Sequence, residues 1–511
     1  MTSIPHRLQV LARQVIAGCL SLQDSPPELQ KVYWLKFLDS YSYFSLSLIF
    51  TLWLTHDFGY SDVTAGTIYG SWGAAITVYG LATGVVIDKL GVRQSLILGY
   101  CLSLISRCML FLTTSRFVLL LNIGLLLPLG NCLGIPVLTI GIRRYTKVQQ
   151  RGFAFGVFYV VMNVAALMSG PMVDICNKVF QNVDVENSDD NNNNKNSEWT
   201  WNQYRMVLLS GIIANAIAVL MTFTIREIKI EEDSTRSEEA NVPGEHSNTT
   251  SMDGVHASME KDIVSTDKEM DVSVFIPSNA SAWSILKETL REKNFWRFLV
   301  VCLIMLNVRM IFRHLDATFP KYMTREFGDG VPYGTIYSIN PAIIMVLVPI
   351  MTAATSDMEP LVMIHIGSYI SAASVFFLAF STSIPACVMF VVVLSIGEAT
   401  WSPRLYDYTM NVCQEGREGT YMALSSAPLF LAKLPVGFMS GYLLQEYCPS
   451  EGERRSKAMW LIIGLTTATS PVLLTTFWKY ISQKDAAIHN YREGSLGIRY
   501  AELAPAAESI D

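Results

Sequence analysis

The stretch Gly84-Val-Val-Ile-Asp88-Lys89-Leu90-Gly91-Val92-Arg93-Gln94 is a short polar connection between two long apolar runs. Apolar runs of about 18 residues or more are typical of membrane-spanning helices, so the connection predicts a tight turn at a membrane surface. Its two glycines allow helix ends to approach and the chain to reverse. Lys89 and Arg93 favour the cytoplasmic side, and Asp88 can accept hydrogen bonds from the N-terminus of another helix.

The composition of the whole chain is that of an integral membrane protein. Of its 511 residues, 51% are hydrophobic and 16% are charged, whereas soluble domains typically carry about 25% charged residues. Windows of about 19 residues predict twelve membrane spans. The spans start near Val32, Thr64, Ser95, Phe117, Gly152, Tyr204, Phe295, Ile336, Leu361, Ile384, Gly419 and Ala458.

Two polar segments interrupt the apolar pattern. Residues 182–197 are rich in Asn and Asp and predict a disordered external loop, while the acidic, Ser/Thr-rich middle of residues 226–294 predicts a cytoplasmic linker. The expected organisation is a cytoplasmic N-terminal tail (1–31), a first six-helix bundle (32–225), a disordered cytoplasmic linker (226–294), a second six-helix bundle (295–481) and a cytoplasmic tail (482–511).

The polar turn resembles the signature loop of the major facilitator superfamily, G-x-x-x-D-[RK]-x-G-[RK]-[RK]. The matching residues are Gly84, Asp88, Lys89, Gly91 and Arg93, and Val92 stands where the family usually has a basic residue. The resemblance implies an all-α membrane protein with twelve transmembrane helices in two six-helix bundles around a central cavity. It also implies that these five residues form a conformational latch in which Asp88 caps the eleventh helix near Gly419 and Thr420.

Charged residues within the predicted spans need a reason, because each costs about 2.5 kcal/mol or more at the centre of a membrane helix. These residues are Lys36, Asp39, Arg107, Arg309, Arg313, His314, Asp316, His365, Glu398 and Lys433. We interpret Lys36, Arg107 and His365 as interfacial or packing residues. Asp39, Glu398 and the cluster of the seventh span are stronger candidates for function.

Three spans resemble motifs of the proton-coupled oligopeptide transporters. Lys36-Phe-Leu-Asp39-Ser40-Tyr41-Ser42-Tyr43-Phe44-Ser45 is similar to E-x-x-E-R-F-x-Y-Y-G. Phe155-Gly-Val-Phe158-Tyr159-Val-Val-Met-Asn163-Val-Ala-Ala166-Leu167 is similar to F-x-x-F-Y-x-x-x-N-x-G-S-L. Gly397-Glu398-Ala-Thr-Trp401-Ser402-Pro403-Arg-Leu405 is similar to G-E-x-x-x-S-P-x-x-L, whose glutamate is expected to face the cavity and bind the positive end of the substrate.

The sequence departs from these motifs where the family handles protons and peptide carboxylates. Lys36, Asp39 and Ser40 stand in place of two glutamates and an arginine, and Ile135 replaces the lysine of the fourth span. These losses argue against peptide specificity. Arg309 or Arg313 can supply the missing positive charge, and their spacing leaves open which of them faces the cavity.

The expected site therefore combines ionisable groups with aromatic and amide contacts. The candidates for proton coupling and the substrate cavity are Asp39, Glu398, Arg309, Arg313, Asp316, Asn163, Tyr43, Tyr159 and Trp401. Tyr41 and Tyr406 are further candidates for the cavity wall. No phosphate loop, metal-ligand cluster or nucleophile motif is evident, so we expect no enzymatic activity, no metal and no cofactor.

These features predict a secondary active transporter that moves a small polar or organic solute by alternating access, in symport with protons. An uncoupled uniporter and a non-transporting sensor or scaffold with the same fold are the alternatives. The expected partners are a small-molecule substrate, protons and the lipid bilayer, with no nucleic acid, and we expect a monomer. The multi-pass protein is expected in the plasma membrane or in an endomembrane such as a vacuole or lysosome, with both termini cytoplasmic.

Overall fold

The computed structural model describes residues 22, 25–146, 151–186, 201–226, 291, 293–355, 358–412 and 430–482. Within these ranges the side chains of residues 81–89, 91, 135–137, 139, 140, 143, 144, 151, 152, 181–186, 294, 410 and 411 are not described. The predicted linker, the two tails and residues 187–197 of the Asn-rich loop fall mostly outside this part of the chain. Residues 182–186 are helical, so the prediction of a disordered loop is wrong for them.

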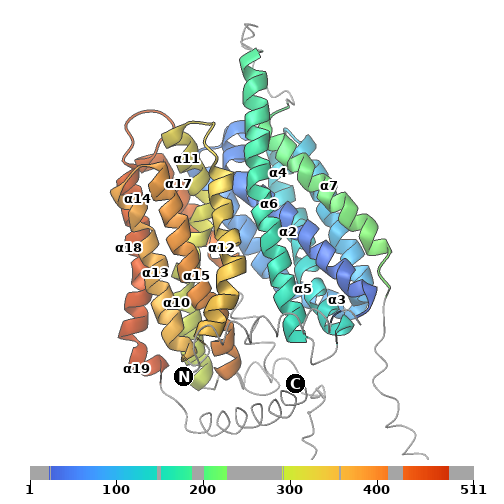
Figure 1. Ribbon diagram of the computed structural model, residues 1–511. Coiled ribbons are helices and arrows are strands. Elements are labelled where there is room, and N and C mark those ends of the chain that lie inside the picture. Colours follow the sequence, from blue (N-terminus) through green and yellow to red (C-terminus); the bar gives the residue numbers. More distant parts are fainter. Residues whose placement is uncertain are drawn as a thin grey trace, which may run out of the picture. The chain divides into compact units, whose positions relative to one another are not determined.

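The regular structure of the described residues is entirely helical, and the helices form two groups that follow each other along the chain (Figure 1). The first helix group comprises α2 (Pro27–Phe58), α3 (Asp62–Leu112), α4 (Arg116–Leu121), η2 (Asn122–Leu126), α5 (Leu127–Tyr145), α6 (Arg151–Glu186) and α7 (Gln203–Phe223). The second helix group comprises α10 (Lys293–Ala317), α11 (Phe319–Phe327), α12 (Tyr333–Ala354), α13 (Pro360–Ser374), α14 (Phe376–Phe380), α15 (Ile384–Val412), α17 (Lys433–Tyr447), α18 (Ser456–Thr476) and α19 (Trp478–Ile481).

Nine helical segments of the described residues are long and apolar enough to cross a membrane. They correspond to the predicted spans that start near Ser95, Phe117, Gly152, Tyr204, Phe295, Ile336, Leu361, Ile384 and Ala458. The remaining three predicted spans correspond to α2, the first part of α3 and α17, and residues 413–429 just before α17 lie outside the description. The chain is thus an integral, multi-pass membrane protein.

The polar turn lies inside α3, an element that runs from Asp62 to Leu112. Two contacts with α5 show that this element is not a straight helix. The thiol of Cys132 donates to the carbonyl oxygen of Ile76 over 3.1 Å. Gly99 packs against Leu133, the residue that follows Cys132 on α5. A Cβ atom added to Gly99 would lie 2.8 Å from the Cβ atom of Leu133. A straight α-helix from Ile76 to Gly99 would span about 35 Å. Because both ends touch the same turn of α5, the chain must fold back between them, as the sequence predicts.

The two helix groups meet along seams between α3 and α17, between α6 and α12, and between α2 and the pair α10 and α11. Glycines make the first two seams very close. A Cβ atom on Gly66 would collide with the carbonyl oxygen of Gly437, and one on Gly170 would collide with that of Gly334. Small residues spaced by four allow membrane helices to bring their backbones into contact, and Gly66 and Gly70 face Gly437 in this way.

Two contacts between residues that are distant in the chain mark the opposite ends of the molecule. At one end, here called the terminal end, Lys31 near the start of α2 donates to the carbonyl of Thr224 after α7 over 2.7 Å. At the opposite end, here called the far end, Arg325 of α11 donates to the carbonyl of Cys448 over 2.6 Å. Cys448 and Cys176 are both free thiols.

Candidate functional site

A cavity of about 160 Å³ lies between the two helix groups. Its lining contains all nine residues predicted for the cavity: Asp39 and Tyr43 of α2, Tyr159 and Asn163 of α6, Arg309, Arg313 and Asp316 of α10, and Glu398 and Trp401 of α15. Their parts in binding and proton coupling stay a prediction. The lining also includes Lys36, Ser40, Phe44, Met162, Ala166, Phe312, Leu315, Tyr337, Asn340, Pro341 and Phe430.

Helical spacing explains why these side chains converge. Residues three, four or seven apart lie on the same face of an α-helix, and Arg309, Arg313 and Asp316 follow this spacing on α10. On α6, Asn163 donates from its side-chain amide to the carbonyl oxygen of Tyr159, over 2.9 Å. Each of these helix faces points toward the neighbouring helices. Their charged side chains therefore lie around one cavity.

Glu398 is held in the cavity wall by an amide. The Nδ2 atom of Asn340 on α12 donates to Oε2 of Glu398 over 2.9 Å and to the hydroxyl of Ser395 over 3.1 Å. The charges of Arg309 and Arg313 act on the same carboxylate from α10. Asn340 was not identified from the sequence, because an amide within an apolar run carries no charge signal.

Arg309 is the exceptional cation of the cavity. Its side chain stacks against Trp401, with the guanidinium carbon 5.2 Å from the ring centroid. The residue is only 8% exposed, yet its Nε and Nη2 atoms have no hydrogen-bond partner among the described residues. Arg309 therefore presents an unpaired edge of the guanidinium group inside the protein.

Arg313, unlike Arg309, forms an ion pair, and its partner is Asp316. Nη1 of Arg313 lies 2.9 Å from Oδ2 of Asp316. The same oxygen accepts hydrogen bonds from Ser47 of α2 over 3.2 Å and from the phenol of Tyr69 on α3 over 3.1 Å. Asp316 consequently joins both helix groups at one buried point.

Lys433 lies beside this point, fully buried at the start of α17. Its Nζ atom is 3.5 Å from the ring centroid of Trp72, 4.7 Å from that of Tyr69 and 4.8 Å from that of Tyr43. Gly73 leaves room for the lysine stem, because a Cβ atom there would collide with it. The sequence identifies Lys433 as an intramembrane charge but not the aromatic cage around it, which the first helix group supplies.

Asp39 occupies the first-group side of the cavity. The positive charges of Lys36 and Arg107 act on its carboxylate, and Gly134 lies beside it, where an added Cβ would be in ordinary contact with Oδ1 at 3.5 Å. Lys36 lies 4.9 Å from the ring centroid of Phe158. Lys36 is buried in the cavity wall and not at an interface, while its predicted role in packing stays a prediction.

Other candidates lie away from the cavity lining. His365 contacts α18, with Nε2 2.9 Å from the hydroxyl of Thr475, in agreement with a packing role. Tyr41 donates to Ser210 of α7 over 3.0 Å, and Tyr406 is 37% exposed. Neither tyrosine is part of the cavity lining, so the expectation that these two residues form its wall is not met.

Asp174 of α6 closes the far end by capping a helix of the other group. Its Oδ1 atom accepts from the backbone amide of Gly334 over 2.9 Å, and Oδ2 accepts from the amide and the hydroxyl of Thr335, each over 2.6 Å. These amides belong to the first turn of α12, where orphan donors and the helix dipole favour an anion. Sequence analysis did not identify Asp174; the signal that could have found it is an acidic residue three positions after Pro171, near the end of an apolar run.

A second closure joins α3 to α11. Asp62 accepts from Nζ of Lys321 over 2.7 Å and from Nη2 of Arg325 over 2.9 Å. Lys321 is 1% exposed, so this ion pair is largely screened from solvent. Sequence analysis did not find this pairing, because Asp62 and Lys321 are 259 residues apart in the chain.

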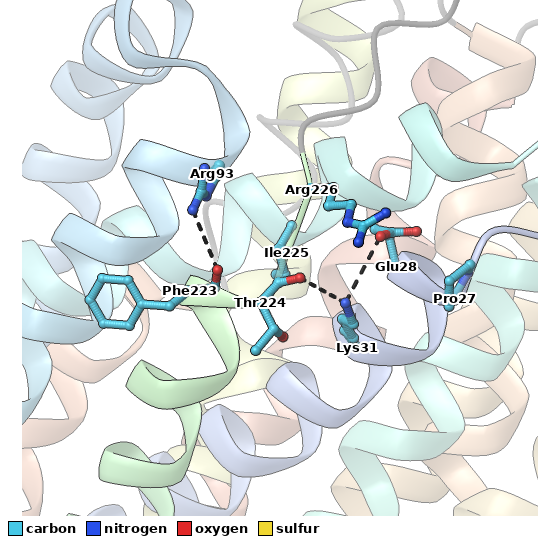
Figure 2. A pocket seen from close by; sticks show the side chains of 8 residues that line it. All are labelled: Pro27, Glu28, Lys31, Arg93, Phe223, Thr224, Ile225 and Arg226. Atoms are coloured by element: carbon cyan, nitrogen blue, oxygen red, sulfur yellow. Dashed lines mark hydrogen bonds and ion pairs between the residues drawn. The ribbon is translucent and has the colours of Figure 1, made fainter.

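The predicted latch at the terminal end lies mostly outside the described residues. This applies to the side chains of Gly84, Asp88, Lys89 and Gly91 and to the proposed docking position at Gly419 and Thr420. Arg93 is described: it reaches the carbonyl of Phe223 over 3.4 Å. Figure 2 shows it in a cleft of about 620 Å³ with Lys31 and Arg226, so its contact is made within the first helix group.

Comparisons with known proteins agree with this architecture. The chain is similar to a POT family transporter solved in complex with a thioalcohol-conjugated peptide, at 15% identity, over 90% of this chain and 97% of that chain, with a TM-score of 0.65. A POT family transporter in complex with 5-aminolevulinic acid gives 15% identity, 90% and 97% coverage and a TM-score of 0.64. The nucleoside transporter NupG gives 14% identity, 90% and 100% coverage and a TM-score of 0.60. At such identities the likeness concerns the fold alone.

A search of curated proteins gives no match to the sequence. The model of the Major Facilitator Superfamily matches residues 32–432, which is most of the chain and includes nearly all of the first helix group and the second as far as α15. With its multiple membrane-spanning helices and its central cavity, this chain belongs to the Major Facilitator Superfamily of membrane transporters.

Proposed function

We propose that the chain is a symporter that couples the movement of a small polar or organic solute to protons by alternating access. The observation that carries the proposal is Glu398, a carboxylate in the cavity wall that accepts from Asn340 over 2.9 Å and feels the charges of Arg309 and Arg313. Asp39 is a second carboxylate in the same cavity, facing Lys36 and Arg107.

Such a carboxylate suits coupling for a physical reason. Its affinity for a proton depends on burial and on the distance to neighbouring cations. A solute or a helix movement that displaces those cations changes proton binding, and by linkage proton binding changes solute affinity to the same degree. A proton gradient can then drive accumulation of the solute.

The contacts between the helix groups support alternating access. Among the described residues, the hydrogen bonds and ion pairs between the groups run from the cavity toward the far end, at Asp62, Asp174, Asp316, Thr51 and Ser338. We therefore interpret the conformation as one closed at the far end. Release of these contacts would allow the groups to rock about the central cavity.

Uptake by purified protein in liposomes tests the proposal. The liposomes are offered a panel of amino acids, dipeptides, sugars and small organic acids, with and without an imposed proton gradient. We expect at least one solute whose uptake the gradient accelerates. We also expect gradient dependence to be lost in Glu398→Gln or in Asp39→Asn, while Glu446→Gln, at an exposed carboxylate of α17, keeps it.

Each other outcome identifies an alternative. Full gradient dependence in both cavity variants would exclude these two carboxylates as the coupling groups. Uptake that no gradient accelerates would indicate a uniporter. Solute binding, seen as a raised melting temperature, without any flux would indicate a sensor or scaffold.

A further inference from the structure

We infer that Arg309 binds the carboxylate of the solute, and that the solute is a small carboxylate no larger than a single amino acid. The inference rests on the proposed transport function, which itself leaves the class of solute open. Five cations of the described residues line the cavity or lie behind it: Lys36, Arg107, Arg309, Arg313 and Lys433.

Each cation that lines the cavity or lies behind it, Arg309 included, has a carboxylate or aromatic rings nearby. Arg313 pairs with Asp316 at 2.9 Å. Lys433 lies within a cage of three aromatic rings. Lys36 and Arg107 act on Asp39. Lys433 Nζ and Arg107 Nε also lack a hydrogen-bond partner among the described residues, but neither residue lines the cavity. Among the cations of the lining, Arg309 differs because two atoms, Nε and Nη2, have no hydrogen-bond partner there, although the residue is only 8% exposed.

The two unpaired atoms are the ones that a carboxylate needs. Nε and Nη2 form one edge of the planar guanidinium group, and their two N–H bonds run side by side. This fork matches the two oxygens of a carboxylate in a bidentate arrangement. Trp401 supports the flat face of the group at 5.2 Å, which fixes the orientation of the edge. A buried guanidinium without a partner is unfavourable, so an anionic ligand is the natural complement.

The size of the cavity limits the rest of the molecule. A cavity of about 160 Å³ is close to the roughly 150 Å³ that accommodates benzene in an engineered protein cavity. This leaves room for a solute of about the size of one amino acid and not for a tripeptide in this conformation. Glu398 and Asn340, also in the lining, offer a second polar pole to an ammonium or hydroxyl group of the solute.

Four probes of matched size test the carboxylate. Butyrate, γ-aminobutyrate, butyramide and n-butylamine are titrated into the purified protein, and the melting temperature is recorded. We expect butyrate or γ-aminobutyrate to raise it by mass action, and the neutral amide and the amine to have little effect. Preference for the amide or the amine over both carboxylates would overturn the inference.

Two substitutions then assign the effect to the fork. Arg309→Gln removes the charge and should weaken carboxylate binding about 10- to 100-fold, as expected for a hydrogen-bonded charged pair. Arg309→Lys keeps the charge without the fork and should weaken it less. Arg455→Gln, at an exposed arginine of the far end, is the matched control and should bind as the wild type does. Unchanged carboxylate binding by a folded Arg309→Gln protein would overturn the inference.

The same proteins separate this inference from the proposed function. Carboxylate binding that depends on Arg309, without flux in liposomes, would support the site and contradict transport. Proton-driven uptake of an uncharged solute, unaffected by Arg309→Gln, would support transport and contradict the site.

Discussion

Arg309 and Arg313 lie one helical turn apart on the same face of α10, yet their surroundings are opposite. Arg313 binds Asp316 at 2.9 Å, within a cluster that also includes Ser47 and Tyr69 of the other helix group. Arg309 rests on Trp401 of its own group and leaves its Nε and Nη2 atoms without a partner among the described residues. Two residues of one type, equally buried at 8% exposure, thus serve different purposes.

The difference shows how a buried charge can be interpreted. A charge whose hydrogen bonds are met by other side chains has become part of the packing, and here it connects two groups of helices. A charge that the fold leaves unmet is kept at a cost, so a ligand is the simplest reason for its presence. Three sets of variants test this distinction and the contacts around it, in order of decreasing effect.

The largest effect is expected from Arg313→Met. It leaves Asp316 charged and buried without its cation, and breaking a buried pair in this way typically costs about 3–5 kcal/mol of unfolding free energy. Arg309→Met should cost less, because Arg309 makes no hydrogen bond through Nε or Nη2 and loses only its stacking on Trp401 and its longer-range attraction to Glu398. Thermal unfolding of both purified variants in detergent provides the measurement.

The double variant Arg313→Met with Asp316→Asn is the control for this comparison. It removes the stranded charge and should regain part of the lost stability. If Arg309→Met destabilises the protein as much as Arg313→Met does, then both arginines are structural and the distinction fails.

A smaller effect is expected from Asp174→Ala at the far end. The substitution removes the acceptor for the first amides of α12, and loss of a helix cap costs about 1–2 kcal/mol. The ratio of open to closed far ends should therefore rise about 5- to 30-fold. Cys176, a buried free thiol of the same helix, reports opening through its rate of labelling by a membrane-impermeant maleimide.

Asp329→Ala is the matched control for far-end opening, because Asp329 is an exposed acid at the same end. Its labelling rate should equal that of the wild type. Equal rates in Asp174→Ala and the wild type would show that the cap does not hold the far end closed.

The smallest effect is expected from Tyr69→Phe. The variant loses the 3.1 Å hydrogen bond to Asp316 but keeps the ring that faces Lys433. Asp316 retains Arg313, so the expected loss is that of one hydrogen bond, about 0.5–1.5 kcal/mol. Thermal unfolding is again the measurement, with Tyr442→Phe at an exposed tyrosine as the control. A loss as large as that of Arg313→Met would mean that Tyr69, and not the arginine, holds the cluster together.

Much of the cavity could be predicted from the sequence, for a specific reason. Charges such as Asp39 and Glu398 stand out within apolar runs, and helical spacing places Arg309, Arg313 and Asp316 on one face. The motif resemblances add Tyr159 and Asn163 at fixed positions. Each of these signals is local: it depends on a residue and its neighbours within a few turns of helix.

The missed residues have partners that are distant in the chain. Asn340 donates to Glu398 from another helix of the same group. Tyr69 and Asp62 of α3 contact Asp316 and Lys321 of the other helix group. Neither an amide nor an aromatic residue is unusual in a membrane helix. Their importance follows from which residues they face, and helical periodicity does not contain that information.

The sequence by itself determined the membrane-spanning helical body, the reversal at the polar turn and the identity of the charged residues that the bilayer makes costly. These follow from hydropathy and from the fixed geometry of the α-helix. The tertiary structure alone decided which charges are paired, with Arg313 bound to Asp316 and Arg309 left open. Pairing depends on distances of a few ångströms between helices, because hydrogen bonds and ion pairs lose their strength beyond that range.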